Sequence, residues 1–194
     1  MQTDDATTIP EHLRRDIGEI LIDASTLEAK LAEIGARVNA DYEGREVLLV
    51  GVLKGAVMVM ADFARHLTIP CAMDFMAVSS YGSSTRSSGV VRILKDLDTE
   101  IEGRDILIVE DIVDSGLTLD WLLRNLRSRN PNSIEVMALL TKPAARQVDV
   151  PIKYTGFAIE DQFVVGYGLD LNEKYRNLPF VGVLTAEAEA AAQD

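Results

Sequence analysis

The run Val47–Leu53 constrains the fold of this chain most strongly, because seven consecutive residues carry no charged or polar side chain. The run has the length of one β-strand. It is apolar at successive rather than alternate positions, which is typical of a strand buried on both faces. Further strands are expected at 72–80, 104–110 and 134–141, with apolar residues at helical spacing between them. Alternating strands and helices in the first 141 residues predict a parallel sheet with helices on both faces.

The remaining elements have shorter signals. Ser25-Thr26-Leu27-Glu28 is a capping box and is expected to open the first long helix. A second helix is expected over 57–67. A third contains Leu119, Leu122, Leu123 and Leu126 and ends by Asn130-Pro131. Short strands are predicted at 90–97, 154–159, 163–166 and 180–184.

One domain is expected over residues 1–194, because no repeat, linker or change of composition divides the chain. Residues 1–8 and 185–194 are expected to be frayed tails, the second of them mostly Ala and Glu. The residues between these tails are sufficient for one substantial hydrophobic core.

Charge and composition exclude several classes of function. The chain has 31 acidic and 19 basic residues, a net charge of −12, which argues against a protein that binds nucleic-acid phosphates over a broad surface. The single cysteine, Cys71, excludes an intramolecular disulfide, and two histidines are too few for a Cys/His zinc site. No apolar stretch reaches 18 residues, and the first residues lack the pattern of a secretory signal. We therefore expect a cytoplasmic protein with no nucleic-acid or membrane partner.

Residues 106–118 carry the strongest chemical signal. A buried strand leads to the adjacent carboxylates Glu110 and Asp111, then to Asp114 and a Ser-Gly-Leu-Thr turn that opens a helix. Free backbone N–H groups at such a turn bind a phosphate monoester, and adjacent carboxylates suit ribose hydroxyls or Mg²⁺. The alternative is that Asp111 and Asp114 only cap the helix, although capping needs neither several acids nor a glycine turn.

The segment Val-Glu-Asp-Ile-Val-Asp-Ser-Gly-Leu-Thr resembles the phosphoribosyl pyrophosphate motif of type I phosphoribosyltransferases, and in particular the hypoxanthine-guanine phosphoribosyltransferases. The resemblance extends from about Ile17 to Leu184. It implies an α/β fold with a central, mostly parallel twisted sheet flanked by helices, and a small hood from about 9–22 and 150–184. It further implies a homodimer or homotetramer that serves purine salvage.

The implied reaction is an Mg²⁺-dependent transfer of the 5-phosphoribosyl group from phosphoribosyl pyrophosphate to hypoxanthine or guanine, giving IMP or GMP and pyrophosphate. Within the resemblance, Glu110 and Asp111 would hold the ribose hydroxyls and Mg²⁺, and Asp114 would act as general acid/base on the purine ring nitrogen. The 5′-phosphate would lie in a cradle formed by Asp114, Ser115, Gly116, Leu117 and Thr118.

Two further motifs agree with this family. Lys54 and Gly55 end the first long strand and resemble the pyrophosphate loop, in which an often cis peptide precedes the lysine; Ala56 stands where the family commonly has a second glycine. The alternative for Lys54, a solvated charge at a helix start, is unfavourable against the helix dipole. Ser80 and Tyr81, with the polar stretch after them, resemble the lid that excludes water from the reacting sugar. An ordinary surface loop would explain the composition equally well.

The base and the second metal would be held by later segments. Lys142 would donate to the 6-oxo group, Phe163 would stack on the purine, and the backbone of Val164 would meet its edge. Asp170 would hold a second Mg²⁺, and Arg176 would neutralise the pyrophosphate. Without the resemblance, Phe163 would be interpreted as a core residue. For Asp170 and Arg176, a surface charge and a site residue would then be equally good interpretations.

Two rival functions stay open at this stage. A regulator with the same fold could bind RNA and keep the phosphate cradle without turnover. A metal-dependent phosphatase could use Asp96 in Asp96-Leu97-Asp98-Thr99, although Arg92 and Lys95 interrupt the strand that such a motif requires, which favours the rim of a hairpin.

Overall fold

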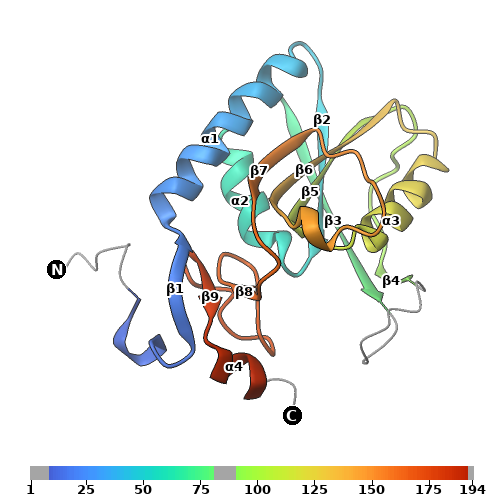
Figure 1. Cartoon of the computed structure of the whole chain (residues 1–194). Helices are drawn as coiled ribbons and strands as arrows, with labels where there is room; N and C mark the ends of the chain where they lie inside the picture. The colour runs from blue at the N-terminus through green and yellow to red at the C-terminus, as the bar shows by residue number, and fades with distance from the viewer. Residues whose placement is uncertain (1–8, 81–90, 192–194) are drawn as a thin grey trace.

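The computed structural model describes residues 9–80 and 91–191. Its main feature is a six-stranded sheet in the order β4-β3-β2-β5-β6-β7 (Figure 1). The strands β2, β3, β5, β6 and β7 are parallel, and the edge strand β4 is antiparallel to β3. Their bounds are β2 Val47–Leu53, β3 Cys71–Ser80, β4 Val91–Lys95, β5 Asp105–Val113, β6 Ser133–Thr141 and β7 Tyr154–Ala158. The predicted α/β class and mostly parallel sheet are confirmed.

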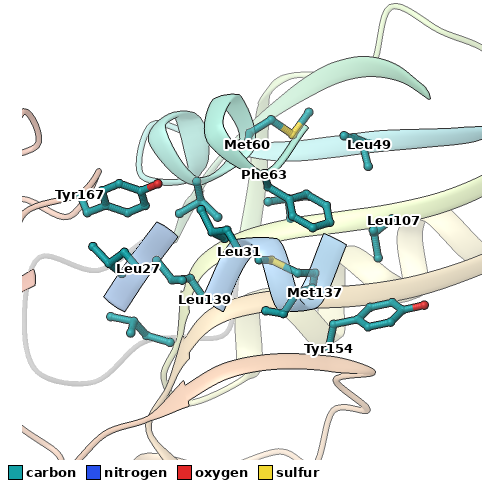
Figure 2. Packing of buried hydrophobic residues seen from close by; sticks show 14 of the residues in the cluster. Leu27, Leu31, Leu49, Met60, Phe63, Leu107, Met137, Leu139, Tyr154 and Tyr167 are labelled. Atoms are coloured by element: carbon teal, nitrogen blue, oxygen red, sulfur yellow. The ribbon is translucent and has the colours of Figure 1, made fainter. Parts of the chain in front are cut away.

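Helices cover both faces of this sheet, and the alternation of side chains explains how. Leu49, Leu107 and Met137 contribute to the core under α1 (Ala24–Asp41) and α2 (Ala56–Arg65), as Figure 2 shows. Their neighbours in the strands, such as Leu48 and Ile108, pack under α3 (Leu117–Arg127) on the opposite face. Successive strand residues point to opposite faces, so an uninterrupted apolar run is what this position requires.

The first helix begins differently from the expected capping box. Its N-cap is Asp23, whose Oδ1 accepts hydrogen bonds from the backbone N–H of Thr26 and from Oγ of Ser25, each at 2.7 Å. Ser25 is therefore the second residue inside the helix, and it supports the cap instead of being the cap. An aspartate carboxylate also favours the positive end of the helix dipole.

A second sheet is formed by segments from both ranges that were expected to make the hood. It has the antiparallel order β1-β9-β8, with bounds β1 Ile17–Ile22, β8 Val164–Val165 and β9 Val181–Leu184. It is preceded by a 3-10 turn, η1 (Glu11–Leu13), and has its own small core, which includes Ile17, Val165 and Phe180. The expected hood range of 150–184 was too wide at its start, because β7 pairs with β6 and belongs to the main sheet. A further 3-10 turn, η2 (Pro143–Ala145), follows β6.

The expected tail at 185–194 was also wrong in part, because Ala186–Ala191 form the short helix α4. Thr185 explains the order there. Its Oγ1 donates to the carbonyl of Arg15 at 2.8 Å, and its backbone N–H donates to the carbonyl of Asp16 at 2.9 Å. These bonds fix the start of α4 against the chain that leads into β1. Within the two described ranges, no helix is long and apolar enough to cross a membrane.

Candidate active site

A pocket of about 400 Å³ lies where β2, β5 and β6 end. The carboxyl ends of parallel strands are where ligands bind in open α/β sheets. Most of the predicted site residues line it; the lining consists of Val52, Leu53, Lys54, Gly55, Glu110, Asp111, Ile112, Asp114, Lys142, Phe163, Val164, Leu169, Asp170 and Arg176. The predicted residues Ser115, Gly116, Leu117 and Thr118 are not part of this lining. Of the other two, Tyr81 lies outside the described residues, and Ser80 is described only as the last residue of β3.

Two adjacent carboxylates enter this pocket from β5, which continues three residues beyond its expected end, to Val113. Burial raises the pKa of Glu110 well above its ordinary value, and the charge of Asp111 raises it further. Burial also raises the pKa of Asp111 to about 6, although the backbone N–H of Ile112, which donates to Oδ1 at 2.8 Å, lowers it in part. Both carboxyl groups are therefore harder to ionise than usual. Two neighbouring carboxyl groups of this kind are suited to a site where a cation binds.

The donor set fits Mg²⁺ that is shared with a substrate. No group of three or more His, Cys, Asp or Glu side chains in the described part of the chain is arranged to hold a metal alone. Mg²⁺ is usually held by one or two carboxylates together with substrate phosphates and water, so a complete protein cage is not required. Glu110 and Asp111 supply hard oxygen ligands, and Asp170 lies close enough for its charge to raise the pKa of Asp111.

The predicted phosphate turn lies between β5 and α3. Gly116 is the residue before the helix and has φ of 83°, a conformation that favours glycine. A Cβ there would also lie 2.8 Å from the carbonyl oxygen of Val148. The carbonyl of Ser115 accepts hydrogen bonds from the backbone N–H groups of Gln147 and Val148, at 2.9 and 3.1 Å. The turn is thus held from behind by the segment after η2, next to the first N–H groups of α3, which begins at Leu117 and Thr118.

Lys54 and Gly55 directly follow β2, which pairs with β5 in the sheet, and both residues line the pocket. The peptide bond Leu53–Lys54 is cis, in agreement with the resemblance to the pyrophosphate loop. A Cβ at Gly55 would overlap Oδ2 of Asp111, so only glycine allows this loop to lie against that carboxylate. Lys54 and Asp111 are therefore brought to the same part of the pocket.

The ammonium of Lys54 is paired with Glu173, a residue that the sequence did not single out. Nζ of Lys54 lies 2.8 Å from Oε2 of Glu173. Nη2 of Arg176 lies 3.3 Å from Oε1 of the same carboxylate and 2.8 Å from Oδ1 of Asp170. Four charged side chains from two distant segments form one network, and three of them were predicted site residues.

The second lysine of the pocket, Lys142, is buried and only 8% exposed. It follows β6, and its backbone N–H donates to the carbonyl of Val113 at 3.0 Å, which ties it to the end of β5. Nζ lies 3.3 Å from Oδ1 of Asp161 and 4.0 Å from Oδ2 of Asp114. Asp161 was missed by sequence reasoning; an acid two residues before Phe163 was the available signal.

Phe163 is 40% exposed and lines the pocket, so its interpretation as a core residue is wrong. Val164 is buried in β8, and the backbone N–H of Leu184 donates to the carbonyl of Phe163 at 3.2 Å. The aromatic ring of Phe163 therefore lines the pocket, whereas residues of the small sheet such as Val165 and Phe180 remain buried in its own core.

The Asp96 segment does not contribute to this pocket. Nη1 and Nη2 of Arg129 donate to the two oxygens of Asp96 at 2.8 and 3.0 Å. The backbone N–H groups of Asp98 and Thr99 donate to the buried carboxylate of Asp74. A carboxylate that is fully engaged by an arginine is poorly suited to act as a nucleophile, and these bonds explain the motif as loop structure.

Comparison with known proteins shows the family that this chain resembles. Residues 19–172 match the family model described as phosphoribosyl transferase domain. The chain is 56% identical over 175 residues to hypoxanthine-guanine phosphoribosyltransferase of Mycobacterium tuberculosis, covering 87% of each chain. It is 51% identical over 172 residues to the Bacillus subtilis protein of the same name, covering 89% of this chain and 96% of the relative.

A crystal structure of a hypoxanthine phosphoribosyltransferase from Staphylococcus aureus superimposes with a TM-score of 0.89 at 43% identity, covering 93% of this chain and 98% of that one. The agreement therefore extends over most of the chain.

Proposed function

This chain belongs to the phosphoribosyltransferase family, and from that premise we propose that it transfers the 5-phosphoribosyl group of phosphoribosyl pyrophosphate to hypoxanthine or guanine. The products would be IMP or GMP and pyrophosphate, so the enzyme would serve purine salvage. The observation that carries this proposal is one pocket lined by a buried lysine, by adjacent carboxylates, and by Lys54 and Arg176, which Glu173 links. Each of these three groups suits a different part of the substrates.

In the part of the pocket that would bind the purine, Lys142 would donate a hydrogen bond to the 6-oxo group. An ammonium has three donors and no acceptor, so it bonds an oxo oxygen and cannot accept a hydrogen bond from a 6-amino group. Its carboxylate partner Asp161, at 3.3 Å, leaves donors free for a ligand. Phe163 offers a partly exposed ring for stacking, and the backbone of Val164 lies beside it.

At the ribose, the purine ring nitrogen would form its bond to the anomeric carbon as the bond from that carbon to pyrophosphate breaks. The bonding electrons leave with pyrophosphate, and the proton on the ring nitrogen passes to Asp114. A carboxylate in this position contributes about 10²–10⁴-fold to the rate. Asp114 is half exposed and lies near Lys142, so it can reach a base held by that lysine.

The 5′-phosphate would be bound by the turn of Asp114, Ser115, Gly116, Leu117 and Thr118, through backbone N–H groups at the start of α3. The supporting observation is that Ser115 and Gly116 are fixed from behind by hydrogen bonds and packing. The turn therefore needs little rearrangement before phosphate binds.

At the pyrophosphate end, Lys54 and Arg176 would neutralise the leaving group. Glu110 and Asp111 would hold Mg²⁺ near the ribose hydroxyls, and Asp170 would hold a second ion. A bound Mg²⁺ supplies charge screening, which makes pyrophosphate a better leaving group. Positioning and electrostatics would provide most of the catalysis.

We also propose a cytoplasmic homodimer or homotetramer. A Trypanosoma cruzi hypoxanthine phosphoribosyl transferase, 36% identical with a TM-score of 0.87, has been studied for its oligomeric state. Phosphoribosyl pyrophosphate, one of the proposed substrates, is a polyanion, which does not cross a bilayer unaided. Sedimentation at several protein concentrations would measure the number of subunits.

The test of the proposed function mixes the protein with phosphoribosyl pyrophosphate, Mg²⁺ and one base at a time, and follows nucleotide formation by absorbance. Hypoxanthine or guanine should give rapid turnover, and xanthine completes the 6-oxopurine series. Absence of nucleotide with every 6-oxopurine would overturn the assignment. RNA binding in a filter assay without any turnover would favour the regulatory alternative.

A further inference from the structure

A single carboxylate bridges the two cations that we assign to pyrophosphate. Oε2 of Glu173 lies 2.8 Å from Nζ of Lys54, and Oε1 lies 3.3 Å from Nη2 of Arg176. Lys54 is 119 residues away in sequence, so this is a tertiary contact between two distant segments and not a local surface pair. Each oxygen of one anion engages one of the two cations, as two phosphate oxygens would.

The position of Glu173 is built by the loop that carries it. Its backbone N–H donates to Oδ2 of Asp170 at 2.8 Å, and Leu171 and Lys174 form an isolated antiparallel bridge around it. Asn172 and Glu173 both have positive φ, 50° and 64°, which is uncommon for residues with a side chain. The other oxygen of Asp170 contacts Arg176 at 2.8 Å. The same aspartate therefore fixes both the tight turn and the arginine that Glu173 contacts.

The contacts of Glu173 are nevertheless easy to exchange. Its side chain is 62% exposed and that of Lys54 is 66% exposed. Exposed ion pairs contribute little to stability, because water screens both charges. A diphosphate carries more negative charge than one carboxylate and offers more acceptors to lysine and arginine. It would therefore displace Glu173, although it must compete with it.

We propose that Glu173 is an internal substitute for pyrophosphate, and that it determines the affinity of the pocket for diphosphate groups. In the free enzyme its carboxylate holds Lys54 and Arg176 at the positions where the leaving group binds. It gives way when phosphoribosyl pyrophosphate enters, and it returns as pyrophosphate dissociates. This inference rests on the proposed function, because that function assigns the two cations to pyrophosphate.

The neutral variant Glu173→Gln keeps the size of the side chain and removes its charge. Inorganic pyrophosphate should then bind more tightly by about 2-fold to 10-fold, because an exposed competing ion pair and a repelling negative charge are lost. The difference between variant and wild type should shrink as salt is added. KM for phosphoribosyl pyrophosphate should fall, whereas kcat should stay equal or decrease if slower release of pyrophosphate limits turnover.

Titration calorimetry with inorganic pyrophosphate in the presence of Mg²⁺ measures this effect. The matched control is Glu43→Gln, which removes the same charge from an exposed residue before β2, at the amino ends of the parallel strands and away from the pocket. It should bind pyrophosphate like the wild type. In a Lys54→Gln background, Glu173→Gln should produce a smaller gain, since one of its two partners is absent.

Equal or weaker pyrophosphate binding by Glu173→Gln, with thermal unfolding unchanged, would overturn the role of Glu173. If the wild type makes nucleotide while the variant shows no gain, only this inference fails. If the wild type makes no nucleotide with any 6-oxopurine, the proposed function fails, and that result comes from an assay without any variant. If the wild type makes nucleotide but neither protein binds pyrophosphate, this inference alone fails.

Discussion

Strand β5 carries a buried carboxylate near each end, and the surroundings of the two shift their pKa values in opposite directions. At its start, Asp105 accepts hydrogen bonds from Oγ of Ser133 at 2.6 Å, from Nδ2 of Asn132 at 2.7 Å and from Nη1 of Arg45 at 3.2 Å. Burial raises the pKa of Asp105, but these bonds lower it more, and the pKa lies below its ordinary value. Near the other end, burial dominates and raises the pKa of Glu110 and Asp111.

This difference shows how one strand serves both stability and function. The charge of Asp105 is satisfied within the fold, so it supports the native state. The charges of Glu110 and Asp111 are not satisfied to the same degree, which costs stability until a cation or substrate arrives. Functional ends of a fold commonly carry such a cost.

The largest expected effect comes from removing metal at the functional end. EDTA should abolish nucleotide formation, and added Mg²⁺ should restore it, because Glu110, Asp111 and Asp170 are suited to hold that ion beside the leaving group. Thermal unfolding of the EDTA-treated protein serves as the control and should show that the fold persists. Full turnover in metal-free buffer would contradict the proposal that Glu110 and Asp111 serve the reaction by holding Mg²⁺.

The next effect concerns Asp114, just beyond the end of β5. Replacing it with Asn keeps the shape of the turn and removes the proton acceptor. We expect kcat to fall by about 10²–10³-fold, with a small change in KM for phosphoribosyl pyrophosphate. Steady-state kinetics on both substrates measure this. A kcat that stays within a few-fold of the wild type would mean that Asp114 only supports the turn.

The smallest effects are on stability, and they should have opposite signs at the two ends. Asp105→Asn should lower the free energy of unfolding by about 1–3 kcal/mol, since it weakens three hydrogen bonds to a charged group. Glu110→Gln should raise that free energy by about 1 kcal/mol, because it removes a buried carboxyl whose ionisation is unfavourable, while activity falls. Urea denaturation at pH 7 measures both variants. If both substitutions change the free energy of unfolding in the same direction, the proposed difference between the two ends of β5 is wrong.

The pH dependence of the stability of Asp105→Asn, measured against the wild type, sharpens the comparison. The pKa of Asp105 is lowered by folding, so its contribution to stability is present above the ordinary value of 3.8 and is lost as pH falls through the folded pKa. The destabilisation caused by Asp105→Asn should therefore be largest near neutral pH and shrink below about 3.8. A difference that grows on acidification would contradict the assignment of Asp105 as an ionised, satisfied group.

Patterns that depend on neighbours in the chain were predictable from the sequence. The bounds of β2 agree with its apolar run, and Leu119, Leu122 and Leu126 lie on the buried face of α3, because period and burial are local properties. Most of the pocket lining was also predicted, because strand ends in a parallel sheet converge at one edge.

Features that depend on contacts between distant segments were not predictable. Asp161 and Glu173 acquire their roles only through lysines that are 19 and 119 residues away. The helix α4 depends on hydrogen bonds from Thr185 to the segment before β1, and β7 joins the main sheet by pairing with β6. Neither long-range pairing leaves a periodic signal in the sequence.

Comparing kcat/KM for hypoxanthine and adenine, in the wild type and in Lys142→Gln, tests most directly whether this protein is a 6-oxopurine phosphoribosyltransferase. Adenine would place amino hydrogens against a buried ammonium that is only 8% exposed, and sites that lose a buried polar pairing discriminate by about 10⁴-fold or more. We expect that ratio in the wild type. The ratio should narrow in Lys142→Gln, mainly through loss of hypoxanthine activity, because an amide can present either oxygen or nitrogen. Comparable use of adenine by the wild type, or an unchanged ratio in the variant, would contradict the assignment.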